Sequence, residues 1–246
     1  MEISLEGLAV VTGAATGIGR ATAEAARDAG AEVIAVDRST EGLASLSGVQ
    51  TLLVDLSDEH QRADLIAQTH GARYLVNAAG LMRMKNILDF TPKDIRDIYA
   101  VNFEAVWDLT SGIGRHMPAG GSIVNLSSVS ARLPTTLETA VYASSKAAVI
   151  SLTRSFAYAF APQNVRVNTV LPGIINTDMQ DQVLAELARL RNISVEEIST
   201  TRMNMVPLNR EAQPSECASL ICFLLSDLAG YITGQAIVQD GGIVTG

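Results

Sequence analysis

Short, uninterrupted apolar runs alternate along this chain with longer helical patterns. Seven of the runs predict strands, at residues 8–12, 32–36, 51–55, 74–77, 122–126, 166–170 and 236–239. Because most of them lack a strict alternation of apolar and polar positions, they are typical of strands covered on both faces. Strands that alternate with helices predict an α/β fold with a doubly wound parallel sheet of about seven strands, flanked by helices.

Nothing in the sequence divides these units into separate domains. No linker rich in Pro, Gly or Ser and no charged run interrupts the 246 residues, so we expect one domain over residues 1–246. Thr91, with Pro92 at the first helical position, marks the start of a helix. Residues 178–208 follow a Pro-Gly strand end, and we expect them to fold over the binding site as a lid.

A glycine-rich turn follows the first strand and opens an alanine-rich helix. Gly13 allows the tight turn, Gly17 lets the backbone approach a pyrophosphate, and Gly19 lets the helix pack closely on the strand. Thr16 and Ile18 lie in the same turn and are expected to contact the bound molecule. The turn follows a strand and opens a helix, and this context predicts a dinucleotide site in a Rossmann-type sheet.

The end of the second strand predicts which dinucleotide binds. Asp37 can accept hydrogen bonds from the adenosine ribose hydroxyls, and its charge repels a 2′-phosphate, which favours NAD over NADP. The neighbouring Arg38 could stack on adenine or offset part of that repulsion. The use of NADP therefore stays open.

Tyr142 and Lys146 stand four residues apart in a helix predicted over residues 137–161. Side chains at i and i+4 share one helix face, so this phenol and this ammonium can share a site. A phenol ordinarily titrates near pH ~10, and a nearby cation lowers its pKa. The spacing favours a tyrosine that acts as a general acid/base, although an isolated pair of this kind is more often a solvated helix face.

Six ordered motifs together resemble the short-chain dehydrogenase/reductase family over essentially the full chain. The motifs are Thr12-Gly13-x-x-x-Gly17-x-Gly19, Asn77-Ala78-Ala79-Gly80, Val101-Asn102-Phe103, Ser127-Ser128, Tyr142-x-x-x-Lys146 and Pro172-Gly173-Ile174-Ile175-Asn176-Thr177. Ala78 departs from the Asn that is common in the family, a change that spares the backbone contacts. The spacing from Ser128 to Tyr142 is one residue longer than usual and leaves Ser127 as an alternative, but Ser128 holds the family's position.

The resemblance implies a role for each motif. Tyr142 would be the acid/base, and Ser128 would hydrogen-bond the substrate oxygen. Lys146 would hold the nicotinamide ribose and lower the tyrosine pKa, and Asn102 would order a water linked to that lysine. The implied contacts to the cofactor come from Asp55 and Leu56 at the adenine, and from Asn77, Ala78, Ala79, Gly80, Tyr142, Lys146, Pro172, Gly173, Ile175 and Thr177.

The resemblance also implies an activity and an assembly. The activity is the NAD(H)-dependent interconversion of a secondary alcohol and a ketone by hydride transfer, on a small polar molecule such as a cyclic diol, a hydroxy acid or a sugar alcohol. The implied assembly is a homotetramer formed by paired helices. Long helices over residues 91–117 and 137–161 are expected to display aromatic residues beyond the needs of one sheet face, namely Trp107, Phe156 and Phe160.

The sequence leaves the substrate open. The run after Gly80, residues 81–84, looks like the 2,3-dihydro-2,3-dihydroxybenzoate dehydrogenases, and the lid is equally similar to polyol and hydroxy-acid dehydrogenases. An arginine at the mouth of the site could hold a substrate carboxylate. Arg83 is the first candidate and Arg202 the second, although Arg83 could equally be a solvated surface residue. Two alternative functions remain, an NADP-linked 3-oxoacyl-type reductase and a dinucleotide-binding sensor without turnover.

Composition narrows the possible partners. A net charge of -8 without a run of Lys or Arg argues against nucleic acid and anionic membranes, and leaves a small-molecule substrate. No apolar run reaches the ~18 residues that span a bilayer, so a cytoplasmic protein is expected. The two cysteines, Cys217 and Cys222, are expected to be buried thiols, and His60, His70 and His116 show no metal-ligand spacing.

Overall fold

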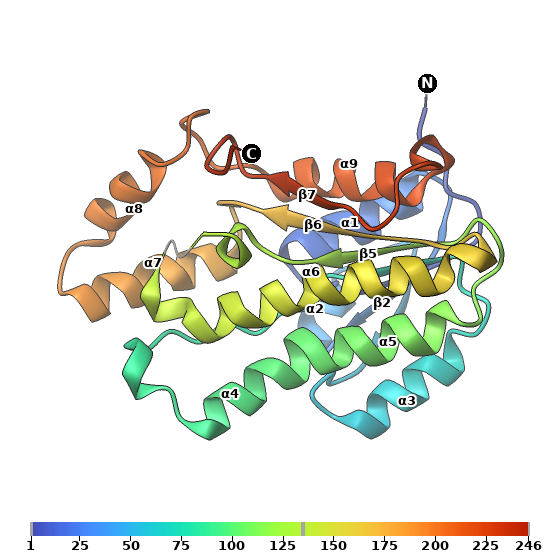
Figure 1. The fold of residues 1–246 in the computed structure, drawn as a ribbon, viewed down its shortest axis with the longest axis horizontal. Helices are drawn as coiled ribbons and strands as arrows, with labels where there is room; N and C mark the ends of the chain where they lie inside the picture. Colours follow the sequence, from blue (N-terminus) through green and yellow to red (C-terminus); the bar gives the residue numbers. More distant parts are fainter. Residues whose placement is uncertain (1, 134–135, 246) are drawn as a thin grey trace.

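A single parallel sheet of seven strands forms the centre of the computed structural model, which describes residues 2–133 and 136–245 (Figure 1). The strand order is β3-β2-β1-β4-β5-β6-β7, so the chain leaves the central β1 first toward one edge and then toward the other. This order confirms the predicted doubly wound α/β fold. The strands are β1 (Leu8–Thr12), β2 (Glu32–Asp37), β3 (Gln50–Leu53), β4 (Tyr74–Asn77), β5 (Ser122–Leu126), β6 (Arg166–Pro172) and β7 (Ala236–Gln239).

Two strands end two residues away from the predicted position. Strand β3 ends at Leu53 and not at Asp55, because the Asp55 carboxylate accepts hydrogen bonds from the backbone and hydroxyl of Ser57 and so forms a turn. Strand β6 continues to Pro172, which pairs with Gln239 of β7. Both ends lie at the carboxyl edge of the sheet, where doubly wound folds bind their ligands.

Helices cover both faces of the sheet (Figure 1). One face carries α1 and α9, which pack on each other, and the other face carries α3, α5 and α6. Both layers bury apolar side chains against the strands, which explains the continuous apolar runs in the sequence. The helices are α1 (Gly17–Asp28), α2 (Thr40–Ala44), α3 (Glu59–Gln68), α4 (Pro92–Tyr99), α5 (Ala105–Gly114), α6 (Ala140–Phe160), α7 (Asp178–Arg191), α8 (Val195–Met203) and α9 (Pro214–Leu225).

The predicted helix over residues 91–117 is divided by a π-helical turn. Thr91 caps α4 with Pro92 at the first helical position, as predicted. Residues Ala100–Glu104 then form a π-turn before α5 begins. π-turns are rare and frequently occur at functional sites. This one contains Asn102.

The expected aromatic surface is only partly present. Trp107 is 48% exposed and contacts the half-buried Phe156 edge to face, with ring centroids 5.1 Å apart. Phe160 does not belong to this surface, because its ring is buried beside Gly114, where a side chain would collide with it. The prediction for Phe160 was therefore wrong.

The predicted lid forms α7 and α8, which lie beyond the carboxyl ends of the strands (Figure 1). A small apolar cluster joins the two helices to the segment after β4, through Val183, Leu187, Ala188, Ile198, Met82 and Met84. The guanidinium of Arg191 donates two hydrogen bonds of 2.9 Å to the carboxylate of Glu138, which precedes α6. Two connections therefore hold the lid against the body of the protein.

The described helices include none that combines the length and the apolar character required to cross a membrane. Cys217 and Cys222 are buried free thiols in α9, as predicted. Burial raises the pKa of Cys217 to about 12 and that of Cys222 to about 11. Both side chains are therefore inert packing residues.

Candidate active site

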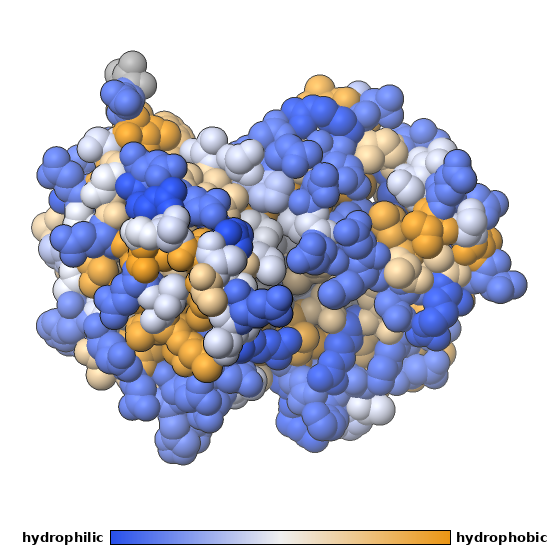
Figure 2. All heavy atoms as spheres, turned by 180° about the vertical axis from the view of Figure 1, so that it is seen from behind, coloured by the Kyte–Doolittle hydropathy of each residue, from blue (hydrophilic) through white to orange (hydrophobic). Residues whose placement is uncertain are grey.

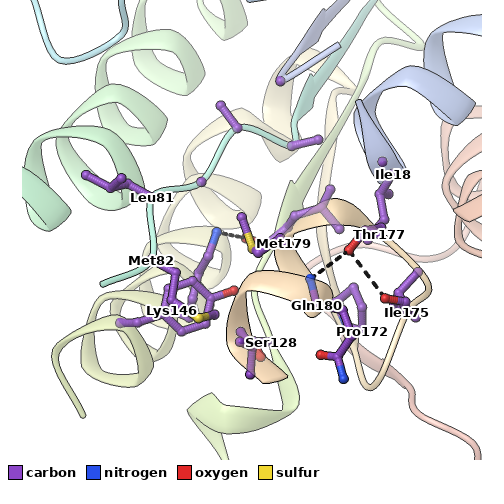
Figure 3. A pocket seen from close by; sticks show the side chains of 18 of the residues that line it. Ile18, Leu81, Met82, Ser128, Lys146, Pro172, Ile175, Thr177, Met179 and Gln180 are labelled. Carbon is purple, nitrogen blue, oxygen red and sulfur yellow. Dashed lines mark hydrogen bonds between the residues drawn. The ribbon is translucent and has the colours of Figure 1, made fainter. Parts of the chain in front are cut away.

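A cavity of about 360 Å³ opens at the carboxyl edge of the sheet, between the glycine-rich turn and the lid. Ser128, Lys146 and Met82 lie on one side of it, and Thr177 and Gln180, from the start of α7, lie on the other (Figure 3). From behind, the surface of the molecule is hollowed between two lobes (Figure 2). The residues predicted for the site that line the cavity are Gly13, Thr16, Gly17, Ile18, Gly19, Asp37, Arg38, Asp55, Leu56, Ala78, Ala79, Gly80, Ser128, Tyr142, Lys146, Pro172, Gly173, Ile175, Thr177 and Arg202.

The glycine-rich turn forms a cradle with free backbone N–H groups. A Cβ on Gly13 would stand 2.7 Å from the amide nitrogen of Ala79, and the φ angle of Gly17 is +56°, so both positions require glycine. Helix α1 begins without a side-chain cap and without an acidic residue in its first turn. Since the first N–H groups of a helix have no partner within it, this end can bind the phosphates of a dinucleotide.

Asp37 lines the cavity and is held in place by the main chain. Its two carboxylate oxygens accept hydrogen bonds from the backbone N–H groups of Ala15, at 3.1 Å, and Ser39, at 3.0 Å. The carboxylate therefore joins the glycine-rich turn to the end of β2. Arg38 beside it is exposed, and no residue within the described ranges accepts a hydrogen bond from its side chain.

Tyr142 and Lys146 lie on one face of α6, and both are buried. The Lys146 ammonium donates a hydrogen bond of 2.8 Å to the carbonyl of Leu126 and lies 5.8 Å from the centre of the Tyr142 ring. Burial lowers the pKa of Lys146 to about 8. Burial raises the pKa of Tyr142 to about 12, and a hydrogen bond with Ser128 opposes that rise.

These directions correct one expectation. Lys146 was expected to lower the pKa of Tyr142, but in this structure burial raises it. The physical reason is that Lys146 directs its ammonium to a carbonyl at the end of β5, while burial weakens its own charge. The pKa values of this buried phenol and this buried amine will respond to any charge that enters the cavity.

The structure distinguishes between Ser127 and Ser128. The Ser127 hydroxyl donates a hydrogen bond of 2.7 Å to the carbonyl of Lys146 and so ties β5 to α6. The Ser128 hydroxyl interacts with Tyr142 and with Ser130. Ser128 is therefore the serine whose hydroxyl lies beside the phenol.

Asn77 and Asn102 lie behind the cavity and do not line it. The amide of Asn102 accepts a hydrogen bond of 2.7 Å from the Leu81 N–H and donates one of 3.0 Å to the Leu81 carbonyl. Asn77 donates to Asn125 and Thr110, within the core. Both asparagines position backbone segments that border the site.

Of the two arginines considered for a substrate carboxylate, Arg202 and not Arg83 lies at the cavity. Arg83 does not line the cavity, since its guanidinium is paired with Asp94 at 3.1 Å and Asp97 at 2.7 Å. Two carboxylates on α4 thus already neutralise Arg83, and no local sequence pattern predicts this pairing. Arg202, the second candidate, lines the cavity from the last turn of α8.

Sequence reasoning gave no role to several residues that line the cavity. They are Val54, Leu81, Met82, Val101, Leu126, Val129, Ser130, Thr136, Thr139, Ile174 and Ile243. Thr139 lies three positions before Tyr142, and this helical spacing could have indicated it. Ile243 comes from the carboxyl-terminal segment, and no local signal indicates that residue. Within the described residues, no group of His, Cys, Asp and Glu is arranged to hold a metal ion.

Comparisons with known proteins agree with this geometry. A family model described as enoyl-(acyl carrier protein) reductase matches residues 13–244. The chain is 37% identical to 3-oxoacyl-(acyl-carrier-protein) reductase of Thermotoga maritima, over 98% of this chain and 99% of that protein. It is 33% identical to L-xylulose reductase of Cavia porcellus, over 99% of both. The structure of L-sorbose reductase from Gluconobacter frateurii, complexed with NADPH and L-sorbose, covers 100% of both chains with a TM-score of 0.91 and 27% identity.

The chain therefore belongs to the short-chain dehydrogenase/reductase family. It is an oxidoreductase of the kind that binds a nicotinamide dinucleotide.

The buried Lys146 makes the stability of the protein depend on pH. Its folded pKa, about 8, lies below the unfolded value of 10.5, so the unfolded chain binds more protons between these values and stability rises with pH. Relative to Lys146→Met, the wild-type protein should gain roughly 1 kcal/mol in free energy of unfolding from pH 7 to pH 9. Denaturant unfolding of both proteins at the two pH values measures this gain. Lys93→Met, which removes an exposed lysine, is the control. If the difference in free energy of unfolding between the wild type and Lys146→Met does not change with pH, the lowered pKa of Lys146 is contradicted.

Proposed function

We propose that this protein is an NAD(H)-dependent dehydrogenase/reductase that interconverts a secondary alcohol and a ketone on a small polar molecule. The observation that carries the proposal is the contact between the Tyr142 phenol and the Ser128 hydroxyl in the cavity that the glycine-rich turn also lines. A proton-transfer group and a dinucleotide cradle thus share one space. Lid helices α7 and α8 border the same space and would exclude water from it.

Each polar residue beside the phenol has a distinct task. In the direction of oxidation, Tyr142 accepts the hydroxyl proton of the substrate, and in reduction it returns a proton to the developing alkoxide. Ser128 donates a hydrogen bond to the same oxygen and stabilises its charge. Ser130 donates its backbone N–H to the Ser128 hydroxyl at 3.2 Å, which orients that hydroxyl.

The residues that would hold the cofactor fit it. The free N–H groups at the start of α1 would hold the pyrophosphate, Asp37 the adenosine ribose, and Lys146 the nicotinamide ribose. Thr177, with Ile175, would hold the carboxamide, because its hydroxyl lies at the start of α7 beside the Ile175 carbonyl. The bound dinucleotide supplies the hydride acceptor and, when oxidised, a positive charge that lowers the pKa of a nearby phenol.

The preference for NAD rests on Asp37. Its carboxylate is held by two backbone N–H groups and cannot turn away without breaking both bonds. A 2′-phosphate at this position would meet a fixed like charge. The second candidate is an NADP-linked reductase, favoured by the exposed Arg38 and by solved relatives that are bound to NADPH or NADP.

Removal of the Tyr142 hydroxyl tests the proton transfer. Tyr142→Phe keeps the ring that packs in the cavity, so NADH binding should be retained. Turnover should fall by about 10² to 10⁴, the range for a positioned general acid/base. Turnover is measured by NADH absorbance, and binding by the change in nicotinamide fluorescence. Turnover close to wild type would exclude Tyr142 as the proton donor, whereas a wild-type protein that binds NADH without turnover would favour a dinucleotide-binding sensor.

The choice of cofactor is tested with a change of charge at nearly constant shape. The wild-type protein should bind NADH more tightly than NADPH. Asp37→Asn should reduce the ratio of the NADPH dissociation constant to the NADH dissociation constant by at least about tenfold, which corresponds to 1.4 kcal/mol. Arg38→Ala is the matched variant, and it should weaken NADPH more than NADH. The test is a side-by-side measurement of the dissociation constants of NADH and NADPH for the wild type and both variants. A wild-type preference for NADPH would mean that Arg38 outweighs Asp37.

We further propose a homotetramer that pairs α5 and α6 between chains. The proposal is supported by large aromatic side chains that these helices expose, Trp107 at 48% and Tyr158 at 86%. Light scattering should then give about four times the 26.0 kDa of one chain. Trp107→Lys should shift the mass toward smaller species, because a buried unpaired charge opposes association. A wild-type mass of one chain would reject this assembly.

A further inference from the structure

Arg202 is half-buried, and its guanidinium has few partners among the described residues. It lines the cavity, and its Nε is buried without a hydrogen-bond acceptor. Within residues 2–133 and 136–245, its one hydrogen bond runs from Nη2 to Oε1 of Gln180, at a long 3.4 Å. No described carboxylate lies within ion-pairing distance of it. The protein therefore leaves most of the hydrogen-bonding capacity of this arginine unused.

A buried arginine of purely structural type in the same chain looks different. Arg166 donates three hydrogen bonds of 2.6 to 3.0 Å to the carbonyls of Leu224, Leu225 and Ser226. Its donors join β6 to the end of α9. Arg202 makes no comparable bonds to the main chain, so it does not hold the fold together in this way.

The surroundings of Arg202 favour a negatively charged ligand. Burial lowers the pKa of Arg202, the positive charge of Arg191 adds to the effect, and Glu211 opposes it from beyond ion-pairing distance. An arginine in a protein stays charged, so the cost of burial remains until an anion pairs with it. Arg191 cannot take that anion, since Glu138 already occupies its guanidinium.

We propose that Arg202 binds the carboxylate of the substrate, and that the substrate is therefore a short hydroxy acid or the corresponding oxo acid. The inference rests on the proposed function, because Tyr142 and Ser128 mark where the reacting carbon lies. A guanidinium holds a carboxylate through two parallel hydrogen bonds and so fixes the reacting end of a short molecule. Gln180 uses its Oε1 on Arg202, which leaves its amide N–H groups for the same carboxylate or a second hydroxyl.

The rest of this end of the cavity suits a short aliphatic chain. Met179, Val183 and Met205 line it with flexible or apolar side chains. In the oxidation, the carbinol C–H bond breaks and its hydride passes to oxidised NAD. The O–H proton passes to the Tyr142 phenolate, which the positive charge of oxidised NAD would favour, and the carbon–oxygen double bond forms. The carboxylate is unchanged and serves only to hold the molecule.

Matched acids and esters test the proposal. A series of hydroxy acids, with the hydroxyl on the second, third or fourth carbon, is compared with the methyl esters of the same acids. For the best acid, Arg202→Met should lower kcat/KM by 10- to 100-fold and leave its ester within about threefold, because the ester lacks the charge. Arg202→Lys should restore part of the loss. Arg83→Met is the control, since its partners lie outside the cavity, and any effect should be equal on acid and ester.

A readout without turnover separates this inference from the proposed function. Butanoate should raise the melting temperature of the wild-type protein more than butanamide does, and Arg202→Met should abolish the difference. Without a ligand, Arg202→Met should itself melt at a higher temperature than the wild type, because it removes a half-buried charge that no described carboxylate pairs with. Failure of Tyr142→Phe to lower turnover would reject the proposed function and leave this binding test intact. Two results would overturn the carboxylate site. One is an equal loss of kcat/KM on acid and ester in Arg202→Met. The other is a melting temperature of Arg202→Met below that of the wild type, together with no effect of butanoate on the wild type.

Discussion

The burial of Lys146, which has no carboxylate partner among the described residues, is the constraint on which the site depends. Its ammonium is held by one carbonyl, that of Leu126, at the carboxyl end of β5. The Ser127 hydroxyl reaches back to the main chain of Lys146, so the strand end and α6 are fastened to each other twice. Because α6 is fixed in this way, the Tyr142 phenol has one position in the cavity, beside Ser128. Burial destabilises the charged form of Lys146 and lowers its pKa. A charged group that binds in the cavity would therefore change the protonation of this lysine.

Parallel topology brings the other components to the same edge. Strands β1, β4 and β5 are neighbours, so the glycine-rich turn, the segment from Ala78 to Leu81 and the serine pair meet although they are far apart in the sequence. The main chains of Gly13 and Ala79 approach so closely that only glycine fits. Asn102, in the π-turn, holds the main chain of Leu81 by a hydrogen bond. In a regular helix, the side chain at this position would point in a different direction.

The sequence predicted much of this arrangement, because its signals are local. The apolar runs, the glycine spacing and the Tyr142–Lys146 spacing each depend on residues within one or two turns of one another. The failures concern contacts between distant segments. Neither the two carboxylates that neutralise Arg83 nor the ring packing that buries Phe160 has a local signal. The direction of the Tyr142 pKa was wrong for the same reason, since burial is a property of the whole fold.

In the proposed function, Tyr142 is a buried acid/base whose ionisation requires the positive charge of the bound, oxidised cofactor. Phenolate absorbance, taken as the difference between the wild type and Tyr142→Phe over a pH titration, measures that ionisation directly. In the free protein Tyr142 should remain protonated through pH 10, in keeping with a pKa of about 12. Oxidised NAD should move the titration to lower pH. A Tyr142 that ionises at or below pH 10 in the free protein, or whose titration does not respond to oxidised NAD, would contradict the account.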